Sequence, residues 1–155
     1  METRDDFRRM IETRLANHKL VVVSNREPYI HSYHGSEIQC MTPASGLTIA
    51  LDPVMQACGG TWIAHGSGNA DKRVVDERHR IRVPPDDPKY TLRRVWLSRD
   101  EEEGHYYGFS NQALWPLCHI VFARPNFDQT HWDYYRKVNQ KFAEVVLEEI
   151  EGERA

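Results

Sequence analysis

The stretch Leu20-Val21-Val22-Val23-Ser24-Asn25-Arg26 decides the fold, because a short apolar run ends abruptly in three polar residues. Residues 19–24 are β-branched and apolar on both faces, which predicts a central strand of a parallel sheet. In an open α/β sheet, ligands bind at the carboxyl ends of such strands. Arg26 follows the strand by two residues, and its planar fork of donors suits a phosphate. The alternative is a surface arginine that pairs with Glu27 or Glu37.

The segments around this strand alternate between helix and strand patterns. Apolar side chains at helical spacing in the first seventeen residues predict an amphipathic helix. A helical pattern over 45–58 and a second apolar strand over 61–64 complete a β-loop-α-β order, which is typical of a doubly wound sheet. Three further elements are expected: strands over 79–83 and 90–97, antiparallel to each other, and a helix over 134–150.

Three other segments are predicted to connect these elements. Residues 25–44 form a long loop, whose length suggests a functional role, and part of it can form a hairpin around Gly35. Residues 100–103 are predicted to be a solvated acidic loop. Residues 106–117 are rich in aromatic side chains and are predicted to form short helical turns.

The composition is that of an ordinary globular chain of 155 residues, long enough for about one domain. No apolar run approaches the ~20 residues that span a bilayer. The net charge of −3 argues against a nucleic-acid surface. The N-terminus carries no export signal, so a cytoplasmic location is expected. Three widely spaced cysteines predict reduced thiols, not disulfides or a zinc site.

The last predicted helix ends where the chain ends. A parallel strand should follow it in a βαβ fold, and none does. We therefore expect these residues to be the front part of a longer protein, with an N-terminal helix over 1–18 and a partial domain over 19–155.

Two other loop features could bind ligands. Ser45-Gly46 stands where a helix begins, and backbone N–H groups beside a glycine can receive a diphosphate. The same pair also caps many helices that bind nothing. His31, His34 and His65 lie in predicted loops and could hold a metal, but no carboxylate or HExxH spacing accompanies them, so solvated histidines are the favoured interpretation.

Tyr106 and Trp115 lie nine residues apart in the aromatic segment. Aromatic rings beside polar groups suit sugars, because a ring stacks on a C–H face and a tyrosine hydroxyl adds a hydrogen bond. Spacing alone favours core packing for both side chains.

Five motifs occur in order over residues 19–147, and together they are specific although each alone is weak. They resemble the trehalose-6-phosphate synthase family of retaining glycosyltransferases, glycosyltransferase family 20. The motifs are Val21-Val-Val-Ser-Asn-Arg26, Ser45-Gly46-Leu47, Gly59-Gly60-Thr61-Trp62, Tyr106-Tyr-Gly-Phe-Ser-Asn111 with Leu114-Trp115-Pro116-Leu117-Cys118-His119, and Tyr135-x-x-Val138-Asn139-x-x-Phe142-Ala143.

The resemblance implies an α/β fold, namely the Rossmann-like N-terminal domain of a GT-B glycosyltransferase. This domain would be incomplete at its C-terminal end, and the second, donor-binding domain would be absent from the chain. The family transfers glucose from UDP-glucose to glucose 6-phosphate, with retention, and gives trehalose 6-phosphate for trehalose biosynthesis. The resemblance implies no metal and no cofactor. We expect the 155 residues alone to be inactive.

The resemblance also assigns site residues, one motif position at a time. Arg26 stands where the family binds the acceptor phosphate, and Tyr106 stands where a tyrosine contacts the acceptor. Trp115 falls on the tryptophan associated with the choice of acceptor anomer. Ser45 and Gly46 occupy the glycine pair that approaches the donor nucleotide sugar. No catalytic residue is assigned.

Two departures from the family pattern leave the acceptor open. Ser45 replaces the first glycine of the donor pair, and His65 stands where the family usually has tryptophan. One alternative is a relative that glucosylates another phosphorylated polyol, such as glycerol phosphate. A second is a non-catalytic phosphosugar-binding module. A dinucleotide-binding domain ranks last because GxGxxG is missing. A homo-oligomer is compatible with the sequence.

Overall fold

The computed structural model describes residues 6, 9–10, 13–14, 18–119 and 122–151. It divides into two compact units, Met1–Val95 and Trp96–Ala155, and each is described by itself. The amphipathic helix predicted for residues 1–18 lies largely outside the described residues and stays a prediction. No helix in the described part has the length and apolar content to cross a bilayer.

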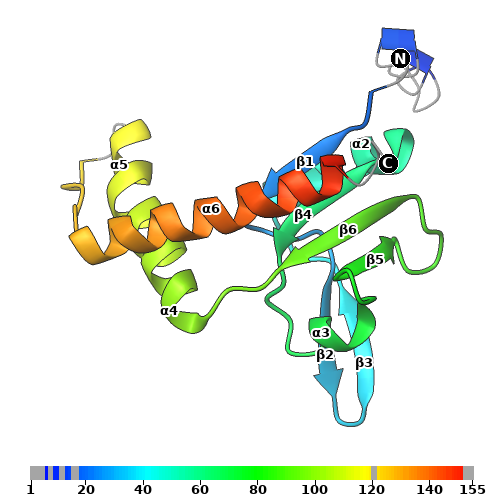
Figure 1. The fold of residues 1–155 in the computed structure, drawn as a ribbon, viewed down its shortest axis with the longest axis horizontal. Helices are drawn as coiled ribbons and strands as arrows, with labels where there is room; N and C mark the ends of the chain where they lie inside the picture. The colour runs from blue at the N-terminus through cyan, green and yellow to red at the C-terminus, as the bar shows by residue number, and fades with distance from the viewer. Residues whose placement is uncertain (1–5, 7–8, 11–12, 15–17, 120–121, 152–155) are drawn as a thin grey trace. The chain divides into compact units, whose positions relative to one another are not determined.

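The first unit is built on a four-stranded sheet with the order β1-β4-β6-β5 (Figure 1). β1 (Val21–Ser24), β4 (Thr61–His65) and β6 (Tyr90–Val95) run parallel, and β5 (Arg80–Val83) is antiparallel to β6. These strands confirm the predicted ones. The central position predicted for β1 is wrong within the described residues, because β1 lies at the edge and Val23 is 47% exposed. The apolar character of these side chains does not fix the position of their strand in the sheet.

A hairpin and a helix connect β1 to β4, as predicted. β2 (Ile30–His34) and β3 (Glu37–Met41) pair around Gly35, whose φ of +63° suits glycine. α2 (Gly46–Cys58) returns the chain to β4. Because α2 runs back against the strand direction, its N-terminus lies toward the carboxyl ends of β1 and β4. A short helix, α3 (Asp71–Val74), follows β4.

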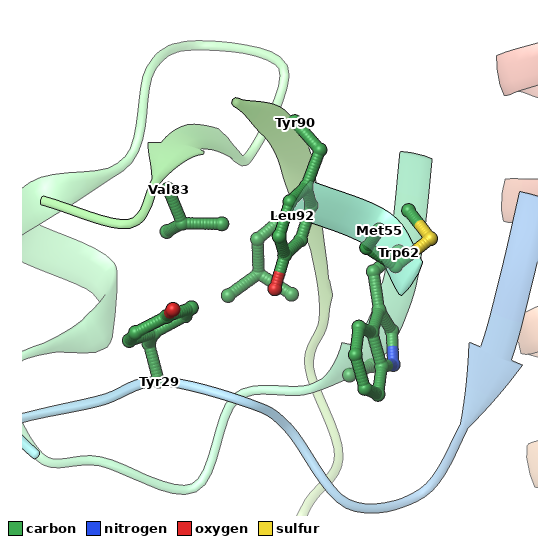
Figure 2. Close-up of a cluster of buried hydrophobic side chains, with 7 residues drawn as sticks. Tyr29, Met55, Trp62, Val83, Tyr90 and Leu92 are labelled. Carbon is green, nitrogen blue, oxygen red and sulfur yellow. The ribbon is translucent and has the colours of Figure 1, made fainter. Parts of the chain in front are cut away.

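The core of the first unit joins the sheet, α2 and the loop after β1 (Figure 2). The rings of Trp62 and Tyr90 stack with centroids 6.3 Å apart. Met55 of α2 and Leu92 of β6 are fully buried in the same cluster. Burial of each large apolar side chain contributes about 1.5–3 kcal/mol, so this cluster holds α2 to the sheet.

The carboxylate of Asp52 adds a polar anchor between α2 and the rest of the first unit. It accepts hydrogen bonds from the hydroxyl groups of Tyr90 at 2.6 Å and Tyr29 at 3.2 Å, and from Gln56 Nε2 at 2.6 Å. Burial and the neighbouring Asp52 charge raise the pKa of both tyrosines, so both hydroxyls stay protonated and donate. Asp52 therefore ties α2 to β6 and to the loop that follows β1.

The second unit is helical and contains α4 (Arg99–Glu102), η1 (Glu103–Leu114), α5 (Trp115–Cys118) and α6 (Gln129–Glu151). The predicted final helix is confirmed. The predicted short turns over 106–117 are instead a long π-helical segment followed by α5. Two glycines allow η1 to approach α6, since a Cβ at Gly104 would overlap Tyr134 and a Cβ at Gly108 would overlap His131.

Glu101 contradicts the prediction of a solvated acidic loop over 100–103. The segment begins a helix with a reciprocal cap between Ser98 and Glu101. The Glu101 side chain is buried and accepts hydrogen bonds from Lys141 Nζ at 2.7 Å and Lys137 Nζ at 3.0 Å. Burial opposes its ionisation, but the bonds from Lys141, the Ser98 backbone and Lys137 outweigh burial and lower the Glu101 pKa to about 2.

We expect Glu101→Gln to lower the free energy of unfolding by about 1–2 kcal/mol at pH 7, because it removes charge-assisted hydrogen bonds. The folded pKa lies below the ordinary value of 4.5, so the carboxylate stabilises fully above that pH and loses its effect as the pH falls toward 2. Urea denaturation at several pH values, followed by circular dichroism, tests this. A difference between variant and parent that is the same at pH 3 and pH 7 would contradict it.

Candidate functional site

The turn after β1 is held in a fixed shape by two consecutive hydrogen bonds. Ser24 Oγ donates to the carbonyl oxygen of Arg26 at 2.6 Å and accepts from Trp62 Nε1 at 2.9 Å. Trp62 is fully buried in β4, whereas Arg26 is exposed. The core of the sheet therefore sets the backbone of the turn that carries Arg26.

The loops after β1 and β4 meet at the same edge of the sheet. The two strands are parallel neighbours, with Ser24 opposite Ala64. Oε1 of Glu27 accepts hydrogen bonds from the backbone N–H of Ser67 at 2.8 Å and from its hydroxyl at 2.7 Å. Arg26 thus lies at the carboxyl edge that the sequence predicted for it.

A buried arginine of β6 lies beneath these loops. Arg94 has no solvent exposure, and its guanidinium forms ion pairs with Glu27 and with Asp71, the latter at 2.8 Å. It also donates to the carbonyl oxygen of Tyr29 at 2.8 Å. Burial lowers the pKa of Arg94 to about 9, which still leaves it charged at neutral pH. Arg94 therefore links β6 to the loops after β1 and after β4.

Asp71 and His31 complete this cluster. Asp71 accepts hydrogen bonds from the backbone N–H of His31 at 2.8 Å and of Gly68 at 2.7 Å, and lies 3.3 Å from His31 Nδ1. Hydrogen bonds with Asp71 and Cys40 raise the His31 pKa to about 9. A Cβ at Gly68 would overlap the His31 carbonyl, so this loop needs glycine to approach β2. We call Glu27, His31, Asp71 and Arg94 the buried quartet.

The predicted solvated histidines are only partly confirmed. His34 is exposed at the end of β2, but His31 and His65 lie in strands and are buried. His65 Nδ1 lies 3.2 Å from the carbonyl oxygen of Val95. Both histidines follow apolar strand residues, and each has a partner at least 30 residues away, Asp71 for His31 and Val95 for His65, which local spacing cannot reveal. Within the described residues, no His, Cys, Asp and Glu side chains gather in a metal-binding group.

The start of α2 holds the second predicted site feature. Ser45 occupies the N-cap position with extended backbone, but its side chain makes no capping hydrogen bond. Gly46 opens the helix, and a Cβ there would meet no atom within 4 Å. Neither residue is therefore explained by the capping of α2 or by the packing of the chain.

Tyr106 and Trp115 belong to the second unit. Tyr106 lies in η1, half-buried, with its ring edge-on to Tyr107 at 5.1 Å. Trp115 begins α5, is 49% exposed and stacks on His119 at 4.5 Å. The core packing that spacing favours is therefore wrong for Trp115. A shallow hollow of about 650 Å³ in this unit is lined by residues that include Tyr107 and His131, but by neither Tyr106 nor Trp115.

Three of the five predicted site residues lie toward one edge of the sheet. Arg26 follows β1 there, and the topology brings the α2 start with Ser45 and Gly46 to the same side. Sequence reasoning missed the roles of Glu27, Asp71 and Arg94. One signal was available: an arginine pair inside the strand predicted over 90–97 requires buried anionic partners.

Comparison with known proteins identifies the family. The model of glycosyltransferase family 20 matches residues 18–155. The chain belongs to this family. It is 38% identical over 132 residues to a trehalose-6-phosphate synthase of Mycobacterium avium, and the match covers 84% of this chain and 26% of that protein.

Solved structures of family relatives share the fold of this chain. A trehalose-6-phosphate protein of E. coli bound with UDP-2-fluoro glucose matches with a TM-score of 0.56 and 28% identity, over 83% of this chain and 24% of its own. An α,α-trehalose-phosphate synthase (UDP-forming) of Burkholderia vietnamiensis matches with a TM-score of 0.54 and 26% identity, over 83% and 24%. The family-20 chain thus has the fold of the N-terminal part of a GT-B glycosyltransferase and spans about a quarter of these relatives.

We expect Arg94→Met to lower the free energy of unfolding by about 3–5 kcal/mol, because it removes the buried cation that Glu27 and Asp71 share. Urea denaturation at pH 7 measures the change. Arg82→Met, which replaces an exposed arginine of β5, is the matched control and should change stability by no more than about 0.5 kcal/mol. Equal effects of the two substitutions would contradict a structural role for Arg94.

Proposed function

We propose that this chain forms the acceptor-binding part of a retaining glucosyltransferase that transfers glucose from UDP-glucose to glucose 6-phosphate and gives trehalose 6-phosphate. The observation that carries the proposal is the anchored turn that presents Arg26 at the carboxyl edge of β1. Membership of family 20 supports the reaction class. The names of relatives, which include a trehalose-6-phosphate synthase and a UDP-forming enzyme, support the product and the nucleotide.

In this proposal the chain contributes to catalysis by positioning the acceptor. The guanidinium of Arg26 binds the phosphate of glucose 6-phosphate through charge-assisted hydrogen bonds. The hydroxyl of Tyr106 contacts the acceptor, and Trp115 influences which anomer is accepted; both roles rest on the motif resemblance. The leaving phosphate of the donor takes the proton of the incoming hydroxyl on the same face. Binding in the reactive geometry and stabilisation of developing charge then supply the rate.

The donor side of the proposal rests on Ser45 and Gly46. Glycine costs about 1 kcal/mol relative to alanine inside a helix, and at the first position of α2 it is still the weaker helix former, so its presence needs a reason. At Gly46 the surrounding atoms leave room for a side chain, and the reason is not found in the packing of this chain. Close approach of a donor diphosphate to the helix start supplies one. The E. coli relative bound with UDP-2-fluoro glucose supports a nucleotide sugar as donor.

A second candidate acceptor follows from His65. This residue stands where the family usually has tryptophan, and it ends β4 at the same edge as Arg26. A smaller, polar ring there favours a relative that glucosylates another phosphorylated polyol, such as glycerol phosphate. We also propose a cytoplasmic location, which the free cysteines support.

We expect Arg26→Ala to raise the KM for glucose 6-phosphate by at least about tenfold, because one charge-assisted contact contributes about 1.5–3 kcal/mol. UDP release from UDP-glucose, measured with increasing acceptor, gives KM and kcat. Glycerol phosphate assayed in parallel distinguishes the two acceptors. Arg82→Ala, which removes an exposed arginine of β5, is the control. An unchanged KM would remove Arg26 from this role.

We expect Gly46→Ala to separate stability from donor binding. The substitution should leave the free energy of unfolding unchanged or raise it by up to about 1 kcal/mol, because alanine is the better helix former. It should also raise the KM for UDP-glucose at least about fivefold, since the added methyl group occupies space near the diphosphate. Thermal denaturation and initial rates measure the two effects. An unchanged KM would place the donor elsewhere.

A further inference from the structure

The hairpin of β2 and β3, which lies beside α3, carries a nucleophilic side chain outside the candidate site (Figure 1). Cys40 is exposed on β3 and lies directly opposite His31 on β2. Opposite residues of an antiparallel pair point to the same face of the sheet, with Cβ atoms about 4.5–5.5 Å apart. The His31 ring forms a hydrogen bond with Cys40. The thiol therefore has an imidazole as its immediate neighbour.

The imidazole is held in place from its other side. Nδ1 of His31 lies 3.3 Å from Asp71 Oδ1, which also accepts a hydrogen bond from the His31 backbone N–H at 2.8 Å. His31 is 5% exposed and Asp71 is fully buried. Cys40, His31 and Asp71 thus connect an exposed thiol through an imidazole to a buried carboxylate, and we call them the hairpin triad. In such an arrangement the third group orients the imidazole for the nucleophile.

The charge state of His31 decides what it does for the thiol. The His31 pKa is raised to about 9, so the ring is protonated at neutral pH and cannot take up the thiol proton. A protonated imidazole instead stabilises negative charge on a neighbouring sulfur. Arg94 Nη2 lies 3.2 Å from His31 Nδ1, and Asp71 Oδ1 contacts both groups, which offsets the repulsion between the two cations. Tyr29, which precedes β2, stays protonated because its pKa is raised.

We propose that Cys40 is a modification site for small disulfides, in which His31 stabilises the attacking sulfur and Asp71 positions His31. Sγ of Cys40 attacks one sulfur of the disulfide, a new S–S bond forms, and the old S–S bond breaks. The second sulfur leaves with the bonding electrons and takes up the proton that Cys40 loses. One thiol and one disulfide thus give a mixed disulfide and a new thiol, without any further oxidant.

The surroundings of Cys40 suit this reaction. All five residues of β3 are exposed, so a small disulfide can reach the sulfur. Cys40, Cys58 and Cys118 are all free, so the Cys40 thiol is available for exchange. The inference uses no residue to which the proposed glucosyl transfer assigns a role, and the two succeed or fail independently.

The rate of reaction with hydroxyethyl disulfide, an uncharged small disulfide, tests the inference. Peptide mass spectrometry on the full chain gives the second-order rate constant of Cys40 at pH 7. His31→Gln should lower this constant by about threefold to tenfold, because the attacking sulfur loses its cation. His34→Gln, which replaces the exposed histidine at the end of the same strand, is the matched control and should leave the constant unchanged. Equal constants for the parent and His31→Gln would overturn the inference.

The pH profile of the same reaction separates charge stabilisation from a change of structure. A local loss of structure in His31→Gln would change the rate alike at every pH. Stabilisation of the sulfur anion predicts a difference that is largest near pH 6 and that vanishes or reverses near pH 10. At the higher pH thiols are ionised without help, and His31 and Arg94 have lost their protons. A difference of constant size from pH 6 to pH 10 would overturn the inference.

Two variants at exposed positions keep the test decisive if His31→Gln does not fold. Cys40→Ser removes the sulfur, so the pKa of His31, measured by NMR titration, should fall below the parent value of about 9. Adding Gln39→Cys to that chain moves the thiol to the opposite face of the exposed strand β3, where its cross-strand neighbour is Ser32. This displaced thiol should react about threefold to tenfold more slowly than Cys40 at pH 7. An unchanged His31 pKa, or equal rates for the two thiols, would overturn the inference.

Discussion

The structure of the first unit depends on one buried cation. Arg94 is fully buried, and taking a guanidinium out of water costs several kcal/mol unless charged and polar partners surround it. Glu27, Asp71 and the carbonyl oxygen of Tyr29 provide them, from segments before β2 and after β4. A buried ion pair adds little net stability, but it tolerates few alternative geometries. The ion pairs of Arg94 therefore give the loops at the carboxyl edge of the sheet a defined shape.

The stability and the geometry of the first unit have different physical origins. Apolar burial of Trp62, Met55 and Leu92 supplies the free energy that holds α2 and the strands together. Polar contacts then choose the geometry: Asp52 ties α2 to two tyrosine hydroxyl groups, and Ser24 ties the turn before Arg26 to the indole of Trp62. Ser24, the last residue of β1, thus connects the apolar core to the turn that carries Arg26, the candidate phosphate site.

The sequence predicted the secondary structure correctly wherever a short-range pattern of residues determines it. Apolar runs and glycines predicted β1, α2, β4, the hairpin around Gly35 and the antiparallel strand pair, and five ordered motifs predicted the family. Predictions failed where partners lie far apart in the chain. Glu101 looked solvated because Lys137 and Lys141 follow it by more than 30 residues, and His31 looked like a loop residue because Asp71 lies 40 residues further on. Charge alone cannot show whether a side chain has a distant counterion.

The charge balance of the buried quartet limits what the surrounding surface can do. With His31 protonated, as its pKa of about 9 implies at neutral pH, two cations and two carboxylates cancel. The electric field at this edge is then set by residues outside the quartet, Arg26 among them. The net charge of the whole chain is −3. The pKa values of His31 and Arg94 both lie at about 9, so above that pH both lose their protons and the quartet becomes net negative, which raises the energy of any anion bound nearby. The anion binding proposed for this edge is thus linked to the protons of two buried groups, His31 on β2 and Arg94 on β6.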